Sequence, residues 1–254
     1  MFSKLKLTKK VSLIVITTFL SACTSFNSPV MSKSDFISKE KLYNSTQNYN
    51  ALISLYRDEL KVQENDAIRY KLAESYYKNG DSRSSLLYLK PLLGQGNLVS
   101  ADAGVLEIRN LIQLNEYRKA IEASDRLVIQ YPNNAEVYNL KGIAYAQLGQ
   151  LDDAQANINK AREFFLNDVV AINNLAMLYI INGDYLSAVN LLLPQYMNGI
   201  KESRLVHNLV FALVKNGDKK YALDIIKKER LNTSPESLVN ALEKTERVSN
   251  IVGR

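Results

Sequence analysis

Catalytic and metal-binding side chains are scarce in this chain. It has one cysteine, Cys23, one histidine, His207, and no tryptophan. A single cysteine cannot form an intramolecular disulfide bond, and a single histidine needs further metal ligands, which no nearby group of Asp or Glu supplies. Neither a GxGxxG nor a GxxxxGKS/T phosphate-binding loop occurs. We therefore expect no catalytic residues, no metal site and no cofactor, and a protein that is not an enzyme.

Helix-breaking residues are also few. Ten glycines and five prolines in 254 residues leave long stretches without a breaker. Such stretches favour helices over the closely spaced turns of a β-sandwich or β-barrel. With 46% apolar and 23% charged residues, the chain has enough apolar surface to form a core or a repeat array. The composition predicts an all-α protein.

Excess positive charge is confined to the beginning of the chain. The formal net charge is +6, but Lys4, Lys6, Lys9 and Lys10 lie in the first ten residues, and no acidic residue precedes Cys23. Without those four lysines, the chain has 28 of its 32 basic residues and all 26 acidic ones, so the two charges nearly balance. A near-neutral body lacks the clustered basic face that nucleic-acid binding requires. We expect no nucleic acid and no small-molecule substrate as a partner.

The first residues have the layout of a secretory signal peptide. A lysine-rich start is followed by the apolar run Val11–Leu20 and by small residues up to Ala22. The run has about half of the ~20 residues that a membrane-spanning helix needs. We therefore predict that residues 1–22 are a signal peptide.

The sequence LSAC at the end of this segment resembles the lipobox of bacterial lipoproteins. The resemblance implies that Cys23 is acylated and becomes the mature N-terminus. The alternative is an unused thiol near an ordinary cleavage site. Because Thr24 and not Asp follows the cysteine, the resemblance implies a lipid anchor on the periplasmic face of the outer membrane. Residues 23–45, rich in Ser, Asn and Lys, are predicted to be a flexible tether, and residues 46–250 the folded domain.

A period of 34 residues runs through the folded domain. It relates Ala120, Ala154, Ala188 and Ala222, and also Gly149, Gly183 and Gly217. The period resembles the tetratricopeptide repeat, a helix–turn–helix unit. That family implies an α-solenoid, a right-handed superhelix in which each unit covers the hydrophobic face of its neighbour. Glycine at the end of the first helix suits the left-handed conformation, and the Asp that follows can cap the second helix.

We place five repeats between residues 66 and 236, with capping helices at both ends. They begin near Asp66, Ala101, Ala135, Val169 and Ser203. Residues 49–61 match the second helix of a preceding unit, and a closing helix begins at Ser234-Pro235. Its Leu238, Leu242 and Val248 would cover the last repeat. An insertion in phase is placed around Gly94 and Gly96, and the second helices are predicted to end or bend at Pro91 and Pro194.

The resemblance also implies a protein-binding groove lined by the first helix of every repeat. Carried over position by position, its lining residues are Tyr70, Tyr77, Arg109, Asn139, Ile143, Asn173, Asn174, Met177, Ile180, His207, Asn208, Phe211 and Val214. Asparagine amides can both donate to and accept from a peptide backbone. The apolar members would form an exposed stripe of the kind that marks interaction sites. Alternatively, the stripe packs within the superhelix or against the tether.

A lipidated repeat protein of this length resembles the TadD-type lipoproteins of tight adherence (Tad/Flp) pilus assembly. The resemblance rests on the leader, the length, the repeats rich in Tyr and Asn, and the single cysteine. It implies a protein partner, either the secretin or another pilus assembly component, and a role in assembling or localising the secretion channel. The alternatives are a pilotin of another type IV pilus, a general envelope-assembly scaffold and a non-catalytic subunit of an enzyme.

Overall fold

The computed structural model describes residues 31–93 and 100–245, and within these ranges it contains helices and no strands. Several predicted features lie outside the described residues: the signal peptide, Cys23, the insertion around Gly94 and Gly96, and Val248. The helices are α1 (Lys33–Ser45), α2 (Tyr49–Val62), α3 (Asp66–Lys78), α4 (Ser82–Leu89), the 3₁₀ helix η1 (Lys90–Leu93), α5 (Ala101–Gln113), α6 (Tyr117–Gln130), α7 (Ala135–Gln147), α8 (Leu151–Glu163), α9 (Asp168–Asn182), α10 (Tyr185–Met197), α11 (Ser203–Asn216), α12 (Lys219–Lys228) and α13 (Pro235–Lys244).

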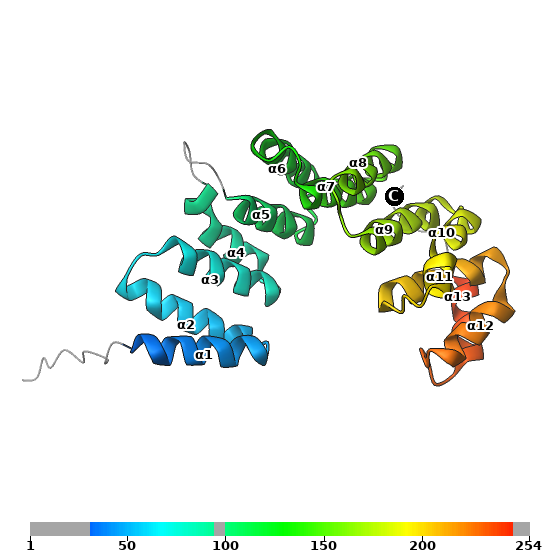
Figure 1. Ribbon diagram of the computed structural model, residues 1–254, viewed down its shortest axis with the longest axis horizontal. Coiled ribbons are helices and arrows are strands. Elements are labelled where there is room, and N and C mark those ends of the chain that lie inside the picture. The colour runs from blue at the N-terminus through cyan, green and yellow to red at the C-terminus, as the bar shows by residue number, and fades with distance from the viewer. Residues whose placement is uncertain (1–30, 94–99, 246–254) are drawn as a thin grey trace, which may run out of the picture.

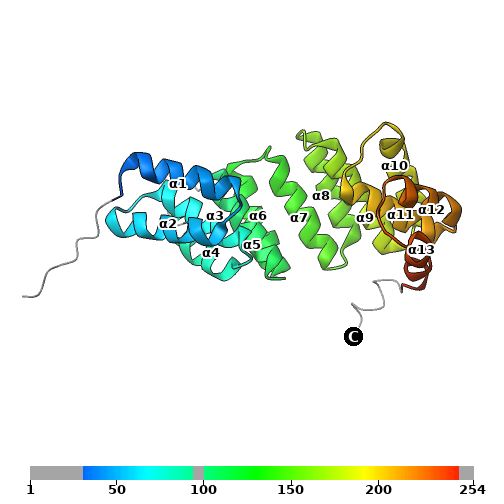
Figure 2. The same ribbon diagram turned by 90° about the horizontal axis from the view of Figure 1, so that it is seen from below.

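The helices pair into hairpins that stack in one row. Repeats 1 to 5 are the hairpins α3–α4, α5–α6, α7–α8, α9–α10 and α11–α12, and each packs on the next. Their first helices begin within one residue of the predicted starts, which confirms the 34-residue period. Figure 1 shows the row curving into an arch, and Figure 2 shows it from below, running from α1 to α12 and α13.

Short turns join the two helices of each hairpin. Gly183 at the end of α9 has a φ of 79°, in the left-handed region, and Asp184 accepts a hydrogen bond from the backbone N–H of Ser187 at 3.1 Å. The same position is glycine in repeats 1, 3 and 5 and Asn115, with a φ of 59°, in repeat 2. Asparagine tolerates this conformation better than other non-glycine residues. The predicted turn chemistry is confirmed, although Asp218 makes no side-chain cap bond to α12.

Small residues allow the two helices of a hairpin to approach closely. A Cβ atom on Gly142 of α7 would lie 2.8 Å from Cγ1 of Ile158 and 3.0 Å from the backbone oxygen of Ala154, both on α8. Gly104 of α5 similarly faces the side chain of Leu127 on α6, with a contact of 2.6 Å. Such contacts leave no room for a methyl group without movement. The repeat pattern therefore reflects packing between paired helices.

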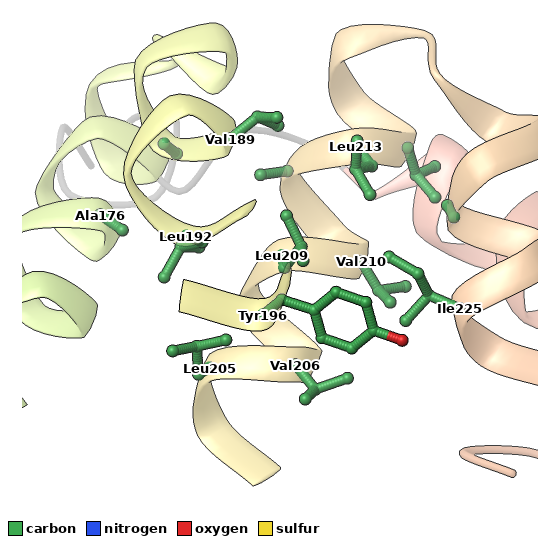
Figure 3. Packing of buried hydrophobic residues seen from close by; sticks show 14 of the residues in the cluster. Ala176, Val189, Leu192, Tyr196, Leu205, Val206, Leu209, Val210, Leu213 and Ile225 are labelled. Carbon is green, nitrogen blue, oxygen red and sulfur yellow. The ribbon is translucent and has the colours of Figure 1, made fainter. Parts of the chain in front are cut away.

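The largest hydrophobic cluster runs from α9 to α13. Figure 3 shows side chains of α10, α11 and α12 converging, with Val206, Leu209 and Val210 of α11 around Tyr196 of α10. Leu209 is completely buried. Leu238 and Leu242 of α13 pack on this cluster, so the closing helix covers the last repeat as predicted.

The N-terminal end differs from the predicted flexible tether. Residues 23–45 were expected to be unfolded, but Lys33–Ser45 form α1, which begins with a hydrogen bond from the N–H of Asp35 to Oγ of Ser32 at 3.1 Å. α1 has no buried residue, and Phe36 and Tyr43 pack on the cluster of α2 and α3. The expectation is therefore wrong for this part of the segment, and α1 and α2 form a further hairpin ahead of repeat 1.

Glu40 of α1 joins three helices through polar contacts. It accepts hydrogen bonds from the hydroxyl of Tyr56 on α2 at 2.8 Å and from Nζ of Lys71 on α3 at 2.7 Å. Burial by itself raises the pKa of Glu40, but the bonds from Lys71 and Tyr56 outweigh it, so the pKa lies below the ordinary value. The charged form of Glu40 therefore stabilises α1 on the array.

The two prolines behave differently. α4 ends at Leu89 and continues as the 3₁₀ helix η1 through Pro91, as predicted. α10 does not end at Pro194, because the helix extends to Met197. Pro194 lies in the last turn of α10, where the N–H of Asn198 still reaches the carbonyl of Pro194 at 3.0 Å. A proline close to a helix end removes one backbone bond without stopping the helix.

Candidate protein-binding surface

The first helices of the repeats lie toward the inside of the arch (Figure 1). We call the surface made by α3, α5, α7, α9 and α11 on this side the concave surface. The structure places every predicted groove residue on one of these helices: Tyr70 and Tyr77 on α3, Arg109 on α5, Asn139 and Ile143 on α7, Asn173, Asn174, Met177 and Ile180 on α9, and His207, Asn208, Phe211 and Val214 on α11.

Charged and tyrosine side chains of repeats 1 to 3 meet on the concave surface. Nε of Arg109 on α5 donates to Glu136 on α7 at 3.2 Å, and its NH2 group forms an ion pair with the same carboxylate. Burial by itself lowers the pKa of Arg109. The hydrogen bonds to Glu136 and the negative charge of that carboxylate outweigh this effect, so the pKa of Arg109 lies above its ordinary value. Burial, followed by the negative charges of Glu74 and Asp102, raises the pKa of Tyr70 to about 12. Tyr70 is therefore neutral at physiological pH.

Glu136 and Asp102 are absent from the predicted groove residues. Both occupy the second position of their repeat, Glu136 one turn before Asn139 and Asp102 two turns before Arg109. The resemblance to the tetratricopeptide repeat implies that the second position faces the groove, so the signal was present in the sequence. Glu74 of α3, another acidic residue of this region, pairs with Lys78 at 2.9 Å.

Four asparagines connect repeats 3, 4 and 5 in pairs. Asn174 donates to the side-chain oxygen of Asn139 at 2.7 Å, and Asn208 donates to that of Asn173 at 2.9 Å. The bonded partners are 35 residues apart rather than one repeat period, because the fifth position of one repeat meets the sixth position of the next. Asn139 and Asn173 are only 8% and 9% exposed. The asparagines therefore stabilise the repeat interfaces, a role that the sequence analysis did not assign to them.

The apolar residues divide into buried and half-buried sets. Ile180 and Val214 are buried in the cluster of α9 to α13, so the expectation that they form an exposed stripe is wrong. Ile143, Met177 and Phe211 are half-buried at the border of the apolar clusters. The accessible apolar surface is therefore narrower than predicted.

His207 is the exposed member of the set. Its Nδ1 lies 2.5 Å from the carbonyl oxygen and 3.1 Å from Oγ of Ser203, one turn earlier in α11. Within residues 31–93 and 100–245 no group of three or more His, Cys, Asp or Glu side chains could hold a metal ion. In the same part of the chain no helix is both long and apolar enough to cross a membrane.

Comparisons with known proteins identify the type of repeat. Residues 116–156 match the tetratricopeptide repeat family, while a search of curated protein sequences gives no significant match. The structure is similar to that of a tetratricopeptide repeat protein from Parabacteroides merdae, with a TM-score of 0.63, 18% identity, and coverage of 83% of this chain and 85% of that one. It is also similar to a thermophilic tetratricopeptide repeat protein of Thermus thermophilus, with a TM-score of 0.59, 20% identity, and coverage of 70% and 97%.

At these identities the likeness concerns the fold. The chain is an all-α tetratricopeptide-repeat solenoid, which confirms the fold class predicted from the 34-residue period.

Proposed function

We propose that this tetratricopeptide-repeat protein is a lipid-anchored scaffold on the periplasmic face of the outer membrane. Its concave surface would bind a segment of a partner protein and thereby assist assembly or localisation of a Tad/Flp-type pilus secretion apparatus. The partner is the secretin or a neighbouring pilus component, and the role is binding rather than catalysis.

The observation that carries the binding role is the accessible chemistry of the concave surface. The first helices of the five repeats, which lie toward the inside of the arch (Figure 1), carry half-buried Tyr70, Tyr77, Arg109, Met177 and Phe211, and exposed His207. Tyr, Met, Phe and Arg are the residue types enriched in protein interfaces. A solenoid presents such a surface without moving its backbone, because each repeat is fixed by its neighbours.

The anchor and the location rest on the sequence of the leader. The LSAC sequence that ends at Cys23 and the Thr at position 24 support lipidation and the outer membrane. Each buried methylene of an acyl chain contributes about 0.8 kcal/mol, so several chains on one cysteine would hold the protein at the bilayer. The tight adherence role rests on the resemblance to TadD-type lipoproteins.

Affinity capture tests the proposed partner and the proposed surface together. The full chain, tagged at its C-terminus, is recovered from detergent-solubilised envelope and its partners are identified by mass spectrometry. We expect the secretin or another tight adherence component to be enriched. Enrichment of outer-membrane assembly or cell-wall synthesis proteins instead would favour a general envelope scaffold, and components of another type IV pilus would favour a pilotin.

The variant Met177→Gln/Phe211→Gln tests whether the concave surface is the site used. It should reduce capture of the partner at least tenfold, because both apolar contacts are lost. The matched control is Phe165→Gln/Leu186→Gln, which replaces two exposed apolar side chains outside the first helices and should capture normally. Thermal unfolding of both variants checks that the fold persists. Equal capture by both variants would contradict the assignment. Asn173 is unsuited to this test, because it is bonded to Asn208.

Lipidation has its own test. Wild-type chain should incorporate labelled palmitate, accumulate as a precursor in globomycin and fractionate with the outer membrane. Cys23→Ser should do none of these. Maturation that is insensitive to globomycin would refute the anchor while leaving the binding role intact.

A further inference from the structure

The charges of the concave surface are unevenly distributed along the arch. The first helices of repeats 1 to 3 carry five acidic and five basic residues: Asp66, Glu74, Asp102, Glu107 and Glu136, and Arg69, Lys71, Lys78, Arg109 and Lys141. Repeat 4 contrasts with them, because its first helix α9 has no charged residue after Asp168 at its first position. Repeat 5 differs again, because α11 carries the basic residues Arg204 and Lys215 and no acidic one. A bound segment therefore meets the carboxylates of repeats 1 to 3 at one end of the surface and, after Asp168, no carboxylate of α9 or α11.

The N-terminal half is better suited to a cation than to an anion. All five basic residues of α3, α5 and α7 are already paired: Lys78 with Glu74, Arg109 with Glu136, Arg69 with Glu64, Lys71 with Glu40 and Lys141 with Asp125. Asp102, in contrast, is exposed and has no ion-pair partner among residues 31–93 and 100–245. An anionic side chain of a bound segment would have to displace a carboxylate from one of these ion pairs. A cationic side chain could instead pair with the free carboxylate of Asp102.

Two tyrosines add a second attraction for a cation. Tyr70 and Tyr77 of α3 are half-buried, and after burial and the contacts with Glu136 both contribute to the pKa of Arg109, which they raise. The face of a tyrosine ring attracts ammonium and guanidinium groups, an effect that increases when the cation is partly desolvated. The ring faces and the carboxylates of Glu74 and Asp102 would thus act on the same bound group.

The half built from α9 and α11 has a different chemistry. Met177 and Phe211 are half-buried apolar side chains. Beside them, Asn173 and Asn174 each use one side of the amide in a bond to another repeat. A basic side chain placed over α9 would lose hydration and gain no ion pair, which costs free energy, because α9 has no charged residue after Asp168 and the charged residues of α11, Arg204 and Lys215, are basic. This half therefore suits apolar side chains on the bound segment.

We propose that the concave surface selects a peptide segment that is basic at one end and apolar at the other. The arginine or lysine side chains lie over α3, α5 and the start of α7, among Tyr70, Tyr77 and Asp102, and the apolar side chains lie over α9 and α11, at Met177 and Phe211. This inference rests on the proposed function, since it assumes that the concave surface is the binding site.

Three fluorescent peptide probes test the inference on the full chain. They share one leucine-rich half, and the other half carries arginines, glutamines or glutamates. Fluorescence anisotropy should show that the arginine probe binds most tightly and the glutamate probe least. A preference of roughly fivefold for arginine over glutamine corresponds to about one exposed ion pair. It should decrease at high salt, where exposed charges are screened.

Two charge variants locate the preference. Glu74→Gln/Asp102→Asn should lower the affinity for the arginine probe to that for the glutamine probe and leave the glutamine probe unchanged. The control Asp58→Asn/Asp224→Asn removes two exposed carboxylates from α2 and α12 and should keep the preference. Met177→Gln/Phe211→Gln should weaken all three probes alike.

The outcomes separate this inference from the proposed function. Equal affinity for the three probes, or tighter binding of the glutamate probe, would overturn the inference while partner capture through the concave surface still stands. No binding of any probe, together with successful capture of a pilus partner, also overturns it. Failure of both experiments would refute the proposed function itself.

Discussion

The two ends of the solenoid differ in the size of the apolar clusters that hold them together. At the C-terminal end a single apolar cluster extends from α9 to α13, and Leu205, Leu209 and Leu213 of α11 are at most 1% exposed. At the N-terminal end two smaller clusters lie among α2 to α5, and polar bonds supplement them. Glu40 bonds α1 to α3, and Asn110 of α5 donates to Ser85 of α4 at 2.8 Å.

This difference predicts an order of unfolding. Apolar burial stabilises the folded state roughly in proportion to the buried area and does not require a strict geometry. A hydrogen bond adds about 1 kcal/mol to the free energy of unfolding, and only while its two groups keep their positions and protonation states. In a solenoid each repeat contacts only its neighbours, so a weak end can unfold while the rest stays folded. We therefore expect α1 and α2 to open first and α9 to α13 to form the most stable part.

The largest expected effect is in the C-terminal cluster. Leu209→Ala should lower the free energy of unfolding by about 3 kcal/mol, because a completely buried leucine is replaced and a cavity is left. The comparison variant Leu52→Ala, in α2 of the N-terminal end, should mainly increase local opening of α1 and α2. Urea unfolding together with hydrogen exchange would separate the two effects. Identical exchange patterns in both variants would contradict the proposed difference between the ends.

A second effect lies at the junction of the two regions. Gly142→Ala should destabilise the protein by about 2 kcal/mol, since the overpacking penalty exceeds the gain in helix propensity. The new methyl group would meet the backbone of Ala154 as well as Ile158. Gly104→Ala is the matched control: it meets only the side chain of Leu127, which can rotate, and should be nearly neutral. Thermal denaturation followed by circular dichroism tests this pair.

A third effect concerns the attachment of α1. The pKa of Glu40 is lowered in the folded protein, so its contribution is present above the unfolded value of 4.5 and is lost as pH falls through the folded value. Acidification, or Glu40→Gln at neutral pH, should weaken the attachment of α1 by about 1 kcal/mol. Protection factors of the α1 amides measure this. Glu122→Gln, which removes an exposed carboxylate of α6, should not change them.

The smallest effect is a gain in stability. Phe165, between α8 and α9, has a φ of 65° and is 95% exposed, whereas glycine occupies the corresponding position 199 after α10, with a φ of 90°. Phe165→Gly should raise the free energy of unfolding by about 0.5–1 kcal/mol, because backbone strain is relieved and almost no packing is lost. The reverse change, Gly199→Phe, should lower it. A lower melting temperature for Phe165→Gly would contradict this account.

Features set by local, periodic signals were predictable from the sequence. The helix starts at Asp66, Ala101, Ala135 and Ser203, and the left-handed turn at Gly183, follow from the repeat and from turn chemistry. The closing helix after Ser234 follows from the proline at its first position. The same reasoning placed the predicted groove residues on the first helices.

Features that depend on distant partners were not predictable. α1 is a polar sequence without a buried residue, and its attachment depends on Lys71, 31 positions beyond Glu40. The bond between Asn139 and Asn174 likewise follows from the rotation between repeats, which the period alone does not specify. The burial of Val214 has the same origin, because residues of several helices cover it.

Under the proposed lipid anchor, the folding of α1 would limit the distance between the array and the bilayer. If Cys23 carries the lipid, only residues 24–32 separate it from Lys33. A fully stretched chain covers about 3.3–3.6 Å per residue, so this segment reaches about 30 Å. The hairpin α1–α2 would then lie within that distance of the lipid headgroups. Any partner farther from that bilayer would then have to be bound by the opposite end of the arch.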